Sequence, residues 1–196
     1  MRSIASVILA TLCQAGIVCV EEQLIIHVSV CNLGDVHAGI LEKAKTEAAT
    51  VFRSAGVRIV WTDCGDFASQ DARGFEVPFI IRLRSDKPPR AAGPLSLDML
   101  GNAFVAEDGN GYLADAYFPA IETVAKEYGG DASGLLGLVI THELGHLLRG
   151  AGHSPDGVMR TRWGRKEISA LQKRWFKFDE QDAAKIRRKL QAKSGS

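Results

Sequence analysis

The chain has 196 residues, of which 46% are hydrophobic and 24% are charged. This length allows one domain with a sizeable core, and the composition is ordinary for a globular protein. The formal net charge is +1, so the overall charge gives no reason to expect nucleic acid or an acidic surface as a partner.

The N-terminal segment, residues 1–20, reads MRSIASVILATLCQAGIVCV, with one arginine ahead of an apolar run. This pattern predicts a signal peptide and therefore a periplasmic or secreted protein. Residues 22–196 would then form the mature domain, with no stable membrane association once the leader is removed. An uncleaved N-terminal anchor is the alternative, because the run is short for a membrane span but close to the required length.

Removal of the leader would leave two cysteines, Cys31 and Cys64. An exported protein with two cysteines is a candidate for one disulfide. The two residues end the apolar runs LIIHVSVC and VRIVWTDC, and the C-terminal ends of neighbouring parallel strands lie side by side. A disulfide and two separate thiols both remain open, since the sequence does not fix the distance between the Cα atoms.

The first half of the domain alternates strands and a helix. Apolar, β-branched runs predict strands at 24–31, 57–61 and 78–83. Helical spacing of apolar residues predicts a helix over 37–55, with Asp35 as a candidate N-cap. A strand, a helix and a strand in this order favour a parallel pair joined by a crossover helix.

The second half adds a hairpin and more helices. DGNG separates GNAFVAE from YLADAYF and predicts an antiparallel hairpin. A short helix is expected over 119–128, followed by a buried helix that starts at Asp131 or Ser133 and ends near Arg149. The last helix is expected over 179–192, and its basic stretch KIRRKLQAK should be a solvated face. The fold class is therefore α+β, or mixed α/β, in a single domain with no repeats or interdomain linker.

A metal-ligand motif, HELGH, lies on the buried helix. His142 and His146 are four residues apart, which places both imidazoles on one helix face, one turn apart. Two neutral imidazoles in this position can bind one Zn²⁺. Glu143 is rotated by about 100° from the first histidine, so its carboxylate can reach a water on the metal. The motif therefore predicts two zinc ligands and a general base.

A third protein ligand is needed before water can take the fourth position of a tetrahedral zinc. His153 is the candidate, because Gly150 can adopt the left-handed conformation that ends a helix and Gly152 eases the turn that follows. The chain could then bring His153 beneath the metal. We therefore expect zinc as the cofactor, held by His142, His146 and His153.

The stretch HELGHLLRGAGH, with Met159 six residues after its last histidine, resembles the signature of the zincin metallopeptidases and, within them, the metzincins. That signature reads H-E-x-x-H-x-x-G-x-x-H, so Gly150 and His153 each come one residue late. The resemblance implies a metzincin-like domain with a twisted mixed sheet, and a turn that packs Met159 under the metal site. The chain also resembles short exported bacterial metalloprotease-like proteins with the same late histidine.

The same resemblance supplies another choice of third ligand. In thermolysin-like zincins this ligand is a glutamate on a later helix, and Glu167 lies near the matching distance. Asp156 is a further candidate. The glycine-rich turn and the methionine would have no role in the glutamate version, which favours His153.

These residues predict an exported zinc-dependent endopeptidase that acts on a peptide or protein substrate. Glu143 would accept a proton from a zinc-bound water that attacks the peptide carbonyl, and later pass it to the leaving amine. The resemblance implies that an antiparallel edge strand binds the extended substrate, and residues 102–106 are the candidate. A zincin-fold module that binds zinc without turnover is the alternative. The sequence gives no signal for the oligomeric state.

Overall fold

A computed structural model describes the chain over residues 23–65, 78–88, 100–165, 168 and 176–194. The predicted leader at 1–20 lies outside these residues, so it stays a prediction. Within the described ranges, no helix combines the length and the apolar character that a membrane span requires.

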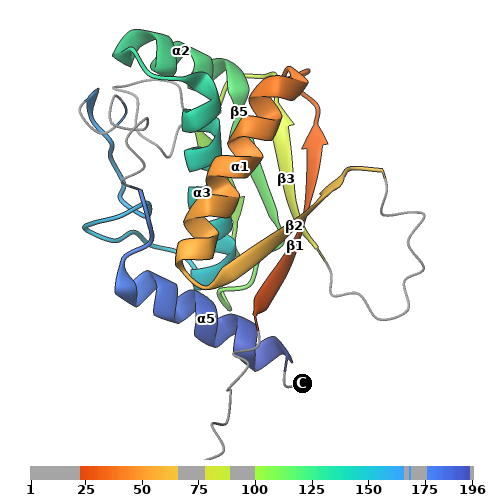
Figure 1. The fold of residues 1–196 in the computed structure, drawn as a ribbon, viewed down its shortest axis with the longest axis vertical. Helices are drawn as coiled ribbons and strands as arrows, with labels where there is room; N and C mark the ends of the chain where they lie inside the picture. Colours follow the sequence, from red (N-terminus) through yellow and green to blue (C-terminus); the bar gives the residue numbers. More distant parts are fainter. Residues whose placement is uncertain (1–22, 66–77, 89–99, 166–167, 169–175, 195–196) are drawn as a thin grey trace, which may run out of the picture.

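A five-stranded mixed sheet forms one layer of the domain (Figure 1). Its strand order is β2-β1-β3-β5-β4, with bounds Leu24–Asn32 for β1, Val57–Asp63 for β2, Phe79–Arg84 for β3, Gly101–Phe104 for β4 and Leu113–Tyr117 for β5. Neighbouring strands among β2, β1, β3 and β5 run parallel, while β4 runs antiparallel to β5 at one edge. The predicted parallel pair and hairpin are both confirmed.

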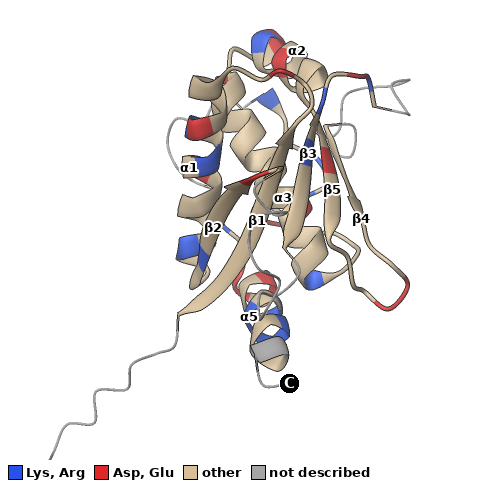
Figure 2. Cartoon of the chain, turned by 90° about the vertical axis from the view of Figure 1, so that its right-hand side faces the viewer, with Lys and Arg blue, Asp and Glu red and all other residues tan. Residues whose placement is uncertain are grey.

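Helices pack on this sheet, with bounds Ala38–Ser54 for α1, Phe118–Tyr128 for α2, Ala132–Arg149 for α3 and Glu180–Ser194 for α5. Figures 1 and 2 show α1, α2 and α3 on one face of the sheet and α5 across the lower end of the domain. The mixed α/β prediction is confirmed, including the crossover helix α1 between the parallel strands β1 and β2.

The start of α1 differs from the prediction. His37 is the N-cap, and its Nδ1 accepts a hydrogen bond of 3.2 Å from the backbone N–H of Gly39. Asp35 lies in the preceding turn with a φ of 47°, a conformation that aspartate tolerates better than most residues. The chain therefore turns at Asp35 and enters the helix two residues later.

Helix α3 is buried on almost every side because it contacts α1, α2, α5, β4 and β5. Asp131 is its N-cap and accepts a hydrogen bond of 3.3 Å from the N–H of Ser133. A Cβ atom on Gly137 would lie 2.7 Å from the carbonyl oxygen of Ala44 in α1, so this glycine allows the two helices to approach closely.

Helix α5 uses part of its basic stretch for internal contacts. Arg187 donates to the carbonyl oxygen of Ala55 at 3.2 Å. Lys189 donates to the carbonyls of Gly109 at 2.7 Å and Leu147 at 3.2 Å. The expected solvated face is thus only partly correct, because two of its cations bind carbonyls at the ends of α1 and α3 and in the β4–β5 connection.

The two cysteines form a disulfide. Strands β1 and β2 pair in parallel with Val30 opposite Asp63, so the residues that follow lie next to each other. The Cα atoms of Cys31 and Cys64 are 4.6 Å apart. Of the two alternatives that the sequence left open, the structure therefore has the disulfide, which ties the ends of β1 and β2.

Replacement of Cys31 and Cys64 together by serine should lower the free energy of unfolding by about 3 kcal/mol, because the bond restricts the unfolded chain over a separation of 33 residues. Urea denaturation of the oxidised protein and of the double variant measures this difference. Reduced wild type is the matched control and should unfold like the variant. Equal stability of the oxidised protein and the variant would contradict a stabilising bond.

Candidate metal centre

Three histidines converge at the C-terminal end of α3. One potential ligand atom from each of His142, His146 and His153 lies within 4.8 Å of the other two. His142 and His146 project from α3, and His153 comes from the segment after the helix. His142 is buried, His146 is half-buried and His153 is exposed. The structure thus brings together the three residues that the sequence nominated.

The spacing of the first two imidazoles suits a shared metal ion. The Nε2 atoms of His142 and His146 are 3.1 Å apart, and the ring planes meet at 82°. Two nitrogens bound to one tetrahedral zinc at about 2.0–2.1 Å would lie about 3.3–3.4 Å apart. The two nitrogens can therefore reach this separation with a shift of a few tenths of an ångström.

The environment of His142 prepares its Nε2 for metal binding. Its Nδ1 lies 2.8 Å from the carbonyl oxygen of Val158. Because a carbonyl only accepts, Nδ1 carries the proton and Nε2 keeps its lone pair. Burial, with smaller contributions from the charges of His146, His153 and Arg149, lowers the pKa of His142 to about 3, against the opposing effect of the Val158 hydrogen bond. The ring is thus neutral at physiological pH, as a ligand must be.

Two glycines shape the turn that carries His153. Gly150 ends α3 as expected, but it combines a φ of 89° with a ψ of −179° instead of the left-handed helical conformation that the sequence suggested. Gly152 has a φ of 93°. Positive φ values of this kind favour glycine. The extended ψ lets the chain leave the helix axis directly, so that the longer connection still returns to the helix.

Met159 is fully buried and packs against the helix turn that carries His146. A Cβ atom on Gly145 would overlap the sulfur of Met159, and it would also lie 3.1 Å from the ring of Phe178. The carbonyl oxygen of Met159 accepts a hydrogen bond of 2.9 Å from the N–H of Ser154. Met159 therefore supports both the helix and the segment that holds the third histidine.

The candidate base, Glu143, is buried at the edge of the sheet, with 3% of its surface exposed. A Cβ atom on Gly101 would overlap its carboxylate. Gly101 is the first residue of β4, so the absence of a side chain there lets the carboxylate lie against the backbone of the edge strand. The fold places the candidate base beside the strand that was expected to bind substrate.

Of the two other candidate ligands, one lies outside this cluster and the other lies outside the described residues. Asp156 is exposed and lies outside the group. Glu167 lies outside the described residues. No other histidine, cysteine or carboxylate that the structure describes belongs to the group. Three protein ligands with a free fourth position are typical of catalytic zinc sites, whereas structural sites use four.

Sequence analysis missed several residues around the site. The Nε atom of Arg149 lies 2.6 Å from Oδ1 of Asp182, and both side chains are almost fully buried. The ring of Trp163 meets His142 edge-on at 6.0 Å between centroids, and its buried Nε1 has no hydrogen-bond partner among the residues that the structure describes. No local motif marks these residues, because each acts through a contact with a distant part of the chain.

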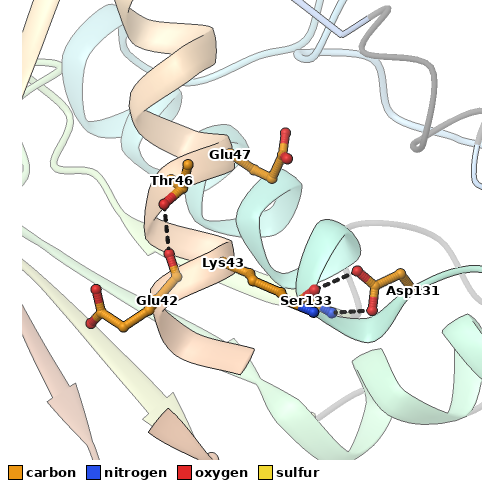
Figure 3. Close-up of a pocket in the computed structure, with 6 residues that line it drawn as sticks. All are labelled: Glu42, Lys43, Thr46, Glu47, Asp131 and Ser133. Carbon is orange, nitrogen blue, oxygen red and sulfur yellow. Dashed lines mark hydrogen bonds between the residues drawn. The ribbon is translucent and has the colours of Figure 1, made fainter. Parts of the chain in front are cut away.

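A pocket of about 270 Å³ lies away from the histidines, between α1 and the start of α3 (Figure 3). Its polar side chains already serve the helices. Asp131 accepts hydrogen bonds from the hydroxyl and N–H groups of Ser133, and the hydroxyl holds the pKa of Asp131 below its ordinary value. Thr46 donates to the carbonyl of Glu42 at 2.8 Å. The hydrogen bonds of these residues thus stabilise α1 and the start of α3, and none of the three histidines lines the pocket.

The free energy of unfolding of the metal-free protein should decrease as the pH is lowered from about 6.5 to about 3. The upper limit is the ordinary pKa of histidine, and the lower limit is the pKa of His142 in the folded protein. In this window the unfolded chain binds a proton that the folded chain does not. Each decrease of one pH unit therefore lowers the free energy of unfolding by up to about 1.4 kcal/mol. Urea denaturation across this window measures the slope. His142→Asn should flatten it, and equal slopes in both proteins would contradict the assignment.

Comparisons with known proteins show which structures share this fold, but they assign the chain to no family. No protein-family profile matches the sequence, and no curated protein matches it. The crystal structure of archaemetzincin from Methanopyrus kandleri is similar with a TM-score of 0.55 and 16% identity, over 88% of this chain and 99% of that chain. Metalloproteinase-II from Bacteroides fragilis is similar with a TM-score of 0.51 and 13% identity, over 86% of this chain but only 54% of that chain. The chain therefore shares its fold with these two proteins, while the low identities say nothing of its activity.

Proposed function

We propose that this protein is a zinc-dependent endopeptidase. The observation that carries the proposal is the convergence of His142, His146 and His153, next to a buried glutamate and with no fourth protein ligand among the described residues. A zinc ion held there would lower the pKa of a bound water to about 7 and polarise a substrate carbonyl. The fold supports the same proposal, since the two similar structures described above are named archaemetzincin and metalloproteinase-II.

The three histidines would hold the metal and Glu143 would move the proton. His142 is oriented by the carbonyl of Val158, which fixes its tautomer with Nε2 toward the cluster. Glu143 would accept a proton from the attacking water as the new C–O bond forms. The same carboxyl group would then donate that proton to the leaving amine as the C–N bond breaks. Both steps need one carboxylate within reach of water and substrate, which its position between α3 and β4 supports.

The edge strand β4 suits an extended peptide. It pairs with β5 on one side only, within the part of the chain that the structure describes. Its other side can offer backbone N–H and C=O groups to an added strand. Because such pairing uses the interior of a peptide and not its end, it favours an endopeptidase. The substrate class that we propose is therefore an unfolded protein segment or a peptide.

We also propose that the protein works after export, in the periplasm or outside the cell. The apolar leader at 1–20 is the main reason. The disulfide between Cys31 and Cys64 supports it, because such bonds persist in oxidising compartments.

Glu143→Gln should reduce peptide cleavage by at least about a hundredfold, because an amide keeps the shape of the side chain but cannot accept the proton. Zinc content should stay the same, since Glu143 is not one of the three proposed ligands. Mass spectrometry of a mixed peptide pool measures cleavage, and elemental analysis measures zinc. Glu107→Gln, at an exposed glutamate in the connection after β4, is the matched control and should cleave like wild type.

Two results would contradict this account in different ways. Wild type that binds zinc but cleaves nothing would identify a zinc-binding module without turnover. Cleavage that survives in Glu143→Gln would show that another group acts as the base.

A further inference from the structure

The third histidine lacks the support that the helix gives the other two. His142 and His146 are fixed by α3, whereas His153 is exposed and lies in a turn with two positive-φ glycines. A Cβ atom on Gly150 or Gly152 would meet nothing within 4 Å. Open space therefore borders the turn at both glycines, and hydrogen bonds of the neighbouring residues help to hold it.

Those contacts flank His153 on both sides. Arg149 donates through Nη1 to the carbonyl oxygen of Gly152 at 2.7 Å. Ser154 donates through its hydroxyl to Oδ2 of Asp182 at 2.6 Å. The residue before His153 is thus held by the last residue of α3, and the residue after it by the first turn of α5.

An ion pair joins these two anchors. Nε of Arg149 and Oδ1 of Asp182 are 2.6 Å apart, with 5% and 0% of the two side chains exposed. The N–H of Asp182 is itself bonded to Asp179 at 2.7 Å, which anchors the carboxylate to the start of α5. Removal of water strengthens the attraction between the two charges.

We infer that Arg149 and Asp182 are positioning residues for the metal centre, which hold the segment Gly150–Ser154 so that His153 reaches the ion. The inference rests on the proposed function, because it gives the pair a task only if His153 is a ligand. It also accounts for the longer connection between the second and third histidines. Arg149 lies in this connection, between His146 and Gly150. It therefore adds to the length of the connection and also holds the turn that follows, through its hydrogen bond to Gly152.

The test is the zinc affinity of the purified full chain, measured by competition with a chromophoric chelator. Asp182→Asn should weaken zinc binding by about ten- to a hundredfold, the usual effect of losing a group that orients a ligand. The same substitution in a His153→Ala background should cause no further loss, because the pair acts through that histidine. Glu180→Gln, which removes an exposed partner of Arg187 on the same helix, is the matched control and should bind zinc like wild type.

A second variant guards against misfolding, because loss of one member leaves a buried charge unpaired. Arg149→Met with Asp182→Leu removes both charges at similar volume and should show the same loss of zinc affinity. Thermal unfolding of the metal-free proteins shows which variants are folded. In the folded variants, the visible spectrum of bound Co²⁺ should shift toward that of His153→Ala, a change that a purely structural role would not cause.

The outcomes separate this inference from the proposed function. Zinc affinity equal to wild type in the charge-free pair variant would overturn the inference and leave the peptidase proposal intact. An equal loss from Asp182→Asn with and without His153 would also overturn it, since the effect would then not pass through that ligand. Wild type that binds no zinc would overturn both proposals.

Discussion

The burial of α3 is the constraint on which the site depends. Other elements cover this helix on almost every side, so the side chains of His142 and Glu143 are buried. A buried imidazole avoids its charged form and needs a partner for its N–H group. The carbonyl of Val158 supplies that partner, sixteen residues further along the chain. The segment after α3 therefore has to return to the helix.

Contacts with α5 help to secure that return. Asp182 accepts from Ser154, and Lys189 donates to the carbonyl of Leu147 near the end of α3. The same lysine reaches Gly109 in the connection between β4 and β5. One C-terminal helix thus links the histidine-bearing turn, the end of α3 and the hairpin that carries the edge strand. The parts that would bind metal and substrate are fixed relative to one another.

Much of the fold follows from the sequence because its determinants are local. Alternating apolar runs predict the strands, DGNG predicts the hairpin, and the apolar residues around the HELGH motif predict a buried helix. The sequence also predicts that Cys31 and Cys64 lie close together, once β1 and β2 are taken as parallel neighbours. Asp35 failed as a helix cap because the chain turns there with a positive φ, and the side chain of His37 accepts the hydrogen bond instead.

The residues of the candidate site that belong to a local motif can also be predicted from the sequence. The spacing of His142, Glu143 and His146 specifies their faces of a helix, and glycines near His153 indicate a turn. The Arg149–Asp182 pair could not be predicted, because its members are 33 positions apart and depend on how α5 packs. The prediction of a solvated face for the basic stretch of α5 was partly wrong for the same reason. Only tertiary contacts decide which of its cations meet water and which meet a carbonyl at the end of another element.

The most direct test of the central claim is a crystal structure of the protein loaded with zinc. The account predicts one ion bound by nitrogens of His142, His146 and His153 at about 2.0–2.1 Å, with solvent at the fourth position. It would be contradicted by an ion bound to the first two histidines and Glu167, with His153 turned away. Four protein ligands around the ion would contradict it as well, since no position would remain for a reacting water.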